Sequence, residues 1–243
     1  MRSLSAAELI RVWEQGMRQS PVGRALTLLA AVSPESEDEL AKLSVGRRDA
    51  RLLEVYEQIF GRTLAAFSEC SQCHESLEYS ISTTDFAGST TEDQGEQTVT
   101  LEIGEMSLQL RQPNTLDLSA LSKCDELSAA RRMLAERCIV EARNGEHPID
   151  PGMLSDAAVE RVAECLAKAD PQAEVLIDLT CPACGHAWQL IFDIEWFLWA
   201  KVSALAKRLL HDVHILAVAY GWAEREILAL TAVRRQFYLE MVG

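Results

Sequence analysis

Two pairs of cysteines are the residues of this chain whose types and spacing could do chemistry. Cys70 and Cys73 form one CxxC motif, and Cys181 and Cys184 form a second one far along the chain. Each motif lies where a predicted strand begins or ends, and Gly185 directly follows the second pair. Tight turns of this kind aim two thiolates at one ion, and two such turns supply the four ligands of a closed tetrahedral zinc site. The sequence therefore predicts a structural Zn²⁺ ion held by the four cysteines, with knuckles that have lost their metal as the alternative.

The same thiols admit two other interpretations. Cys70 to His74 match the motif that attaches c-type haem, but haem attachment requires export and a haem pocket, and the sequence indicates neither. His74 is then expected to be a solvent-facing knuckle residue. Cys181-Pro-Ala-Cys184 is similar to a disulfide-exchange motif, in which a helix N-terminus activates the first thiol. Residues 186–192 instead alternate like a strand, so a thiol-disulfide oxidoreductase is kept only as a third alternative.

The rest of the sequence contains none of the common catalytic motifs. It has no GxSxG, no glycine loop that could bind phosphates and no HExxH. His211 and His214 lie on one predicted helix, but without a third ligand nearby in sequence they are interpreted as surface or packing residues. We therefore expect a protein that is not an enzyme and has no catalytic residues.

Composition and charge limit the class of partner. The chain has 243 residues, of which 48% are hydrophobic and 25% charged, as in an ordinary globular protein. Its formal net charge of −14 argues against nucleic acid as a partner, because affinity for phosphates comes largely from Lys and Arg. A basic protein surface would suit this chain better.

The sequence also bears on membranes and location. The N-terminus MRSLSAAELIRVWEQG lacks a basic region followed by an unbroken apolar core, so no secretory signal is evident. The most apolar segment, residues 191–222, is interrupted by charges such as Asp193, Lys201 and Arg208, which indicates a buried amphipathic helix. We expect no membrane insertion and a cytoplasmic location, where thiols stay reduced.

Hydrophobic periodicity predicts the elements that position the cysteines. Helical patterns cover a first segment after the capping box of Ser5 and Glu8, then residues 21–31, 44–60, 126–142 and 155–168, a long helix that ends at Gly221, and two short final helices. Strand-like alternation covers residues 77–81, a hairpin around Gly104-Glu105, and residues 175–180 and 186–192. The polar stretch AGSTTEDQGEQ, residues 87–97, is predicted to be a loop.

These patterns predict an α+β fold that is mainly helical, with a small antiparallel, zinc-ribbon-like β module embedded in it. Five segments follow one another along the chain: an N-terminal helical region (1–68), the first knuckle with β-hairpins (69–113), a helical insert (114–171), the second knuckle with strands (172–192) and the C-terminal helices (193–243).

Three long strings in the sequence carry a family resemblance. They are LSVGRRDARLLEVYEQIFG before the first CxxC, DPQAEVLIDLTCPACGHAWQLIFDI around the second, and HDVHILAVAYGWAEREILALTAVRRQFYLEMV near the end. Over about Leu43 to Val242, with weak matching in 114–165, the chain resembles the baseplate hub assembly chaperone family of T-even-type phages and related contractile injection systems. The resemblance implies a cytosolic factor that binds an unassembled hub or baseplate protein of a contractile tail. A permanent structural baseplate component is the alternative.

The C-terminal string offers candidate partner-binding residues. Trp222 and Tyr238 are aromatic anchors, and Arg234 and Arg235 are bidentate donors, which are the residue types enriched at interface centres. The alternative is structural: the tryptophan wedges between the last two helices, and the arginines pair with Glu224 or Glu226. The last helix is expected to turn its apolar residues inward, namely Val233, Phe237 and Met241.

Overall fold

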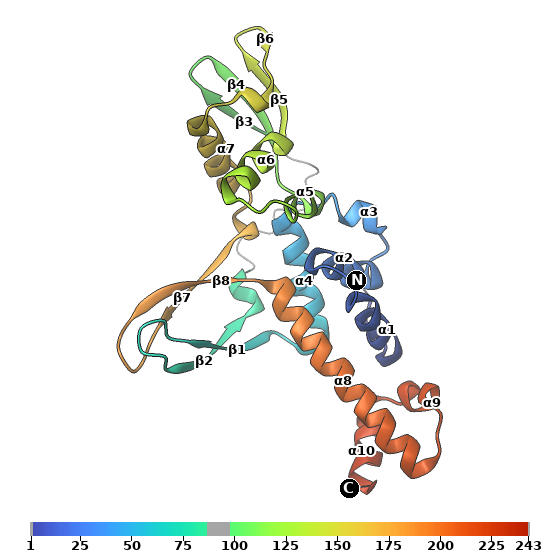
Figure 1. Ribbon diagram of the computed structural model, residues 1–243. Helices are drawn as coiled ribbons and strands as arrows, with labels where there is room; N and C mark the ends of the chain where they lie inside the picture. The colour runs from blue at the N-terminus through green and yellow to red at the C-terminus, as the bar shows by residue number, and fades with distance from the viewer. Residues whose placement is uncertain (1, 87–97, 243) are drawn as a thin grey trace. The chain divides into compact units, whose positions relative to one another are not determined.

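The computed structural model describes residues 2–86 and 98–242, so the predicted polar loop of residues 87–97 lies outside the described residues. The chain forms two compact units. Unit 1 consists of Met1–Glu37 and Ile194–Gly243, and unit 2 consists of Asp38–Asp193. Helices predominate, and the strands form small antiparallel sheets (Figure 1). The mainly helical α+β class predicted from the sequence is therefore confirmed.

Unit 1 is built from helices at both ends of the chain: α1 (Ala6–Gly16), α2 (Pro21–Val32), α8 (Ile194–Tyr220), α9 (Glu224–Ala229) and α10 (Ala232–Val242). The capping box predicted for α1 is present, since Ser5 and Glu8 each bond the other's backbone N–H group. The backbone of Gly221 has a φ of 70°, in the left-handed region that suits glycine, and this conformation ends α8.

The long helix α8 is the element against which the other helices of unit 1 pack. Leu198, Val202 and Leu216 are fully buried along its apolar stripe. α1 crosses α8 at Gly16, where an added Cβ would lie 2.4 Å from the ring of Trp199, so only glycine fits this crossing without displacing the indole. No helix within residues 2–86 and 98–242 has the length and apolarity that spanning a membrane requires.

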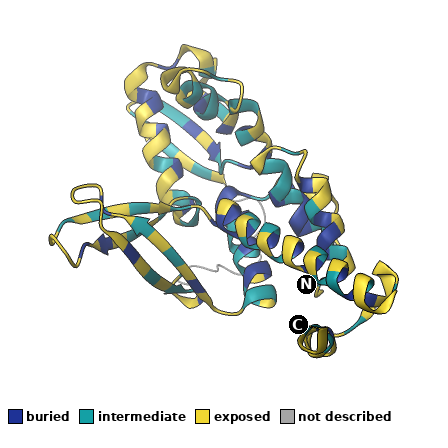
Figure 2. Ribbon diagram, turned by 60° about the horizontal axis from the view of Figure 1, so that its bottom comes forward, coloured by how far each residue is buried: buried dark blue, intermediate teal, exposed yellow. Residues whose placement is uncertain are grey.

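The expected orientation of the last helix is wrong. Val233, Phe237 and Met241 are 81%, 60% and 64% exposed, and most of α10 is coloured as exposed in Figure 2. The face that packs on α8 carries Arg235, whose guanidinium donates to the Asp212 carboxylate at 3.1 Å. Because an ion pair occupies the buried face, the apolar stripe of α10 faces solvent.

Unit 2 contains the remaining elements in three groups. The first is helical, with α3 (Glu37–Leu40) starting at the unit boundary and α4 (Val45–Phe60) following it. The second is the pair of hairpins formed by β1 (Thr63–Glu69) with β2 (Ser76–Ser82) and by β7 (Val175–Thr180) with β8 (Ala187–Phe192). The third group contains the segment 114–171 that was expected as a helical insert together with the hairpin before it, and from here on we call this whole group the insert. It comprises β3 (Thr98–Ile103), β4 (Met106–Arg111), α5 (Thr115–Leu121), α6 (Leu127–Cys138), β5 (Ile139–Asn144), β6 (His147–Pro148) and α7 (Asp156–Ala169). Short 3₁₀ turns lie at Thr83–Phe86, Pro151–Met153 and Pro171–Ala173.

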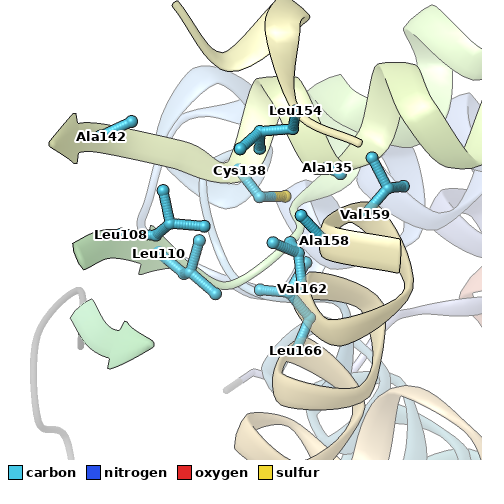
Figure 3. Packing of buried hydrophobic residues seen from close by; sticks show 10 residues of the cluster. All are labelled: Leu108, Leu110, Ala135, Cys138, Ala142, Leu154, Ala158, Val159, Val162 and Leu166. Atoms are coloured by element: carbon cyan, nitrogen blue, oxygen red, sulfur yellow. The ribbon is translucent and has the colours of Figure 1, made fainter. Parts of the chain in front are cut away.

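The insert has its own core between a sheet and two helices. Its four strands are antiparallel in the order β3, β4, β5, β6, and the predicted hairpin around Gly104-Glu105 is present. Figure 3 shows Leu108 and Leu110 of β4 pointing toward Val162 and Leu166 of α7. The helix predicted for residues 126–142 is too long, because the chain leaves α6 at Cys138 and continues as β5.

A buried carboxylate stabilises the insert. Asp117, which is fully buried, accepts two hydrogen bonds from Arg111, at 2.6 and 2.9 Å, and one from Arg137 at 2.9 Å. Burial alone would raise the pKa of Asp117, but these donors and the backbone N–H of Asn114 outweigh burial, so the pKa is lowered. The carboxylate therefore stays ionised, and it joins α5 to β4 and α6.

In each of the two hairpins, the CxxC motif lies in the turn that connects the two strands, and the strand pairing stops at the same position before it. In the first, Glu69 pairs with Ser76 as the last pair before the CxxC turn, and in the second Thr180 pairs with Ala187 at the same place. β2, β7 and β8 match the predicted strands, whereas β1 lies at the end of the segment that was expected to be helical.

Candidate metal centre and partner-binding residues

The structure brings the two CxxC motifs together. The Sγ atoms of Cys70, Cys73, Cys181 and Cys184 all lie within 4.8 Å of one another. Two contacts join the two motifs crosswise, with 3.7 Å between the Sγ atoms of Cys70 and Cys184 and 3.6 Å between those of Cys73 and Cys181. Each knuckle therefore contributes two sulfurs to one cluster.

Each knuckle is shaped by the same pair of backbone hydrogen bonds. In the first, the Cys70 N–H donates to the Glu75 carbonyl at 2.9 Å, and the His74 N–H donates to the Cys70 carbonyl at 3.0 Å. In the second, Cys181 bonds His186 in the same way at 2.8 Å, and Gly185 bonds Cys181 at 2.9 Å. These bonds close a tight turn that holds both thiols on the same side.

The residue after each second cysteine has a left-handed backbone. His74 has a φ of 62° and Gly185 a φ of 74°. Glycine adopts this conformation without steric cost, whereas a residue with a Cβ does not. His74 is also exposed, as expected, and its Nδ1 lies 2.6 Å from Glu69 Oε1. The first knuckle therefore carries a strain that the second lacks.

The sulfur positions suit a tetrahedral metal ion. Zn–S bonds of about 2.3 Å place the sulfurs of a tetrahedron about 3.8 Å apart. The two measured contacts, 3.6 and 3.7 Å, are close to that edge length. They are far longer than the roughly 2.05 Å of a disulfide bond. The four thiols could therefore hold one ion as a closed set of ligands.

Electrostatics within the cluster also favour a cation. Burial raises the pKa of the Cys70 thiol, but hydrogen bonds from the backbone N–H groups of Cys73 and Gln72 outweigh burial and lower that pKa to about 7. For Cys73, the backbone N–H of Glu75 favours the thiolate, yet the neighbouring thiols and burial prevail and raise the pKa to about 12. The first thiolate forms readily, and its negative charge then disfavours deprotonation of the neighbouring thiols. All four thiols can therefore be deprotonated together only when a cation lies among them.

Burial divides the four cysteines into an inner and an outer pair. Cys70 and Cys181 are buried, where Leu77 and Trp188 pack around them, whereas Cys73 and Cys184 are exposed. Sequence reasoning missed the role of His186, which stacks on Trp188 with 5.7 Å between ring centroids. The Nε2 atom of His186 lies 3.2 Å from Ser71 Oγ of the opposite knuckle. The sequence signal that could have indicated this role is the position of His186 directly after the second CxxC motif and Gly185.

The four predicted partner-binding residues lie in unit 1 and have different surroundings. Trp222 stacks on Tyr220 with 4.7 Å between centroids and meets Tyr238 edge-on at 4.9 Å. Arg235 is buried and paired with Asp212 rather than with the acidic residues of α9. Arg234 is exposed. The structure therefore brings the two aromatic residues together and turns the two arginines to different environments.

The chain is therefore a mainly helical α+β protein in which two hairpins meet at four cysteines that could hold one metal ion. The family model described as T4 bacteriophage base plate protein matches residues 24–199, which include both CxxC motifs. The match covers well over half of the chain, and the chain belongs to this family of phage base plate proteins. Neither the curated proteins nor the solved structures contain a significant match. The predicted relation to phage base plates is thus confirmed.

Proposed function

We propose that this protein is a non-enzymatic assembly chaperone for the base plate or hub of a contractile tail, and that it binds an unassembled hub component in the cytoplasm. Membership of the base plate family carries this proposal. The exposed apolar stripe of α10 supports it, since a chaperone has to cover apolar surface on a component that has not yet been assembled. The net charge of −14 is consistent with a protein partner rather than nucleic acid.

We further propose that the four cysteines hold a structural Zn²⁺ ion. The sulfur spacing and the closed set of four ligands support this assignment, since such a site keeps no open position for substrate. The ion would join the two hairpins and stabilise unit 2. A bound zinc would also occupy the thiols that a disulfide-exchange reaction needs.

Comparison of finished particles with the soluble pool tests the chaperone proposal. Mass spectrometry of purified particles should lack this chain, while the tagged chain purified from cells before assembly should carry one hub or base plate protein in fixed ratio. Presence in intact particles at fixed copy number would instead establish the alternative, a permanent structural component.

Metal analysis tests the second proposal. Protein purified without added metal should contain one zinc per chain, and its four knuckle thiols should react slowly with iodoacetamide until a chelator is added. Rapid alkylation of Cys181 in a metal-free protein would favour the oxidoreductase alternative.

A further inference from the structure

α10 presents an apolar stripe on a rigidly held helix. Val233, Phe237 and Met241 recur at steps of four, which places them on one face of the helix, and each is at least 60% exposed. The opposite face is fixed to α8 by the ion pair of Arg235 with Asp212. A stripe that needs no ordering before it binds is suited to docking.

A second set of contacts fixes the same helix. Tyr238 meets Trp222 edge-on at 4.9 Å and Tyr220 at 5.9 Å, so an aromatic cluster joins α10 to the end of α8. The aromatic residues are thus engaged within unit 1. Phe237 of the stripe meets Tyr238 edge-on at 6.2 Å, so the stripe borders this cluster, and its exposed side chains are the surface left for a partner.

The stripe alone is too small to hold two copies of this chain together as a stable dimer. Three side chains of this size, exposed to this extent, present on the order of 300 Å² of apolar surface. Two copies meeting through this stripe alone would bury roughly 600 Å², about half of the roughly 1,200 Å² at the lower end of stable interfaces. A groove that surrounds the helix on three sides covers more of α10, and this is the way amphipathic helices with such spacing commonly bind.

The charge beside the stripe defines the rim of that groove. Arg234 lies one position from Val233 and three from Phe237, and is exposed. Within the part of the chain that the structure describes, its guanidinium has no ion pair, whereas the carboxylate of Glu240, on the other side of the stripe, accepts from Gln236 at 3.2 Å. The stripe therefore lies between one positive side chain, Arg234, which has no ion-pair partner among the described residues, and one negative side chain, Glu240.

The overall acidity of the chain does not contradict a positive docking element. Residues 38–193 contain 13 Lys and Arg against 28 Asp and Glu, whereas the segments of unit 1 contain 10 against 9. The excess of negative charge is confined to unit 2. A partner of unit 1 does not need a basic surface.

From these observations we propose that α10 is a ligand helix: it inserts its Val233, Phe237 and Met241 face into an apolar groove on an unassembled base plate protein, and a carboxylate on the rim of that groove receives Arg234. This inference rests on the proposed chaperone function and adds the contact surface and the chemistry of the partner's site.

Pairwise calorimetry tests the inference. The base plate proteins from the source of this chain are purified singly, and each is titrated with the full-length chain and with its variants. Phe237→Ser should weaken binding to the partner at least tenfold, and Val233→Ser should act in the same direction. Val218→Ser is the matched control, because Val218 is 75% exposed on α8, and it should change the Kd by less than about twofold. All three side chains are exposed, so melting temperatures should change little, with the largest decrease for Phe237→Ser, which also loses the edge-on contact with Tyr238.

Arg234→Glu tests the groove rim. It should weaken binding about fivefold or more, and reversing the rim carboxylate of the partner to lysine should restore it. A partner that binds wild type and Phe237→Ser equally would overturn the ligand-helix inference and leave the chaperone proposal intact. A wild-type dimer that Phe237→Ser abolishes would also overturn it, in favour of a second copy. If no base plate protein binds the wild-type chain, the proposed function itself fails.

Discussion

Gly185 in the second knuckle allows a quantitative test of how backbone conformation supports the metal site. With a φ of 74°, an alanine at this position would adopt a left-handed conformation, which costs roughly 1–2 kcal/mol. No atom lies within 4 Å of the added Cβ, so no steric clash is added. Alanine also restricts the unfolded chain more than glycine does, and this effect reduces the conformational cost by roughly 0.5–1 kcal/mol. We predict a net loss of about 1 kcal/mol.

This loss should appear in the affinity for zinc, because folding of the knuckle and metal binding are coupled. Gly185→Ala should bind zinc about fivefold more weakly in competition with a chromophoric chelator under reducing conditions. His74→Gly should act in the opposite direction, by up to about fivefold, since it relieves the same strain in the first knuckle and loses only an exposed contact with Glu69.

Gly104 provides the matched control. It has a φ of 62° in the turn between β3 and β4, and a Cβ there also meets no neighbour. Gly104→Ala should lower the stability of the insert by a similar amount without changing the zinc affinity. If Gly185→Ala binds zinc as tightly as wild type, or if Gly104→Ala weakens binding equally, the reasoning about the knuckles is wrong.

Four further outcomes are expected. Cys181→Ser should lose zinc and lower the melting temperature, and a variant that keeps stoichiometric metal by elemental analysis would contradict a four-ligand site. Gly16→Ala should destabilise the protein by roughly 1–3 kcal/mol in urea unfolding, because its methyl group would overlap the indole packed there. Arg235→Met should cost roughly 1–2 kcal/mol by leaving the partly buried Asp212 carboxylate without its cation, and an unchanged urea midpoint would refute this. The pKa of Asp117 is lower in the folded protein than its ordinary value of about 4. Its contribution to the free energy of unfolding is therefore present above pH ~4 and is lost as the pH falls through the folded pKa. Asp117→Asn should remove this part of the pH dependence and flatten the plot of stability against pH in acid.

The cysteine cluster could be predicted because its signal is local. Two CxxC motifs, each beside a strand, specify turns whose geometry depends on a few neighbouring residues. The distance along the chain between the motifs does not affect these turns. His74 was harder to interpret, because a left-handed histidine has no sequence signature, and only the equivalence with Gly185 in the structure reveals it.

Three strands were missed: the two-residue β6, which is too short for a pattern, and β1 and β5, whose patterns are weak. On β1 the inward positions after Leu64 are Ala66 and Ser68, which are too small to give a clear alternation, and the strand depends on its pairing with β2. At β5 the chain passes from helix to strand at Cys138 and Ile139 with no glycine or proline to mark the change. β1 is thus determined by the adjacent β2, whereas β5 is determined by β4, from which α5 and α6 separate it along the chain.

The face of α10 was predicted wrongly for a different reason. Periodicity correctly showed that Val233, Phe237 and Met241 share a face, but it does not show which face packs. That choice is made by Asp212 on α8, which pairs with Arg235, and by the aromatic residues that hold Tyr238. A charge pair between α8 and α10 leaves no trace in a hydrophobicity pattern.

Because the insert lies between the two knuckles along the chain, its length can change during evolution with little effect on the stability of the site. Cys73 and Cys181 are 108 positions apart, so an ion shared by them closes a long loop. The entropy of closing such a loop grows only with the logarithm of its length, and halving or doubling it changes the free energy by roughly 0.6 kcal/mol. Descendants of this chain could therefore shorten, enlarge or exchange the sheet and helices between the hairpins, and the proposed metal site would keep nearly the same stability.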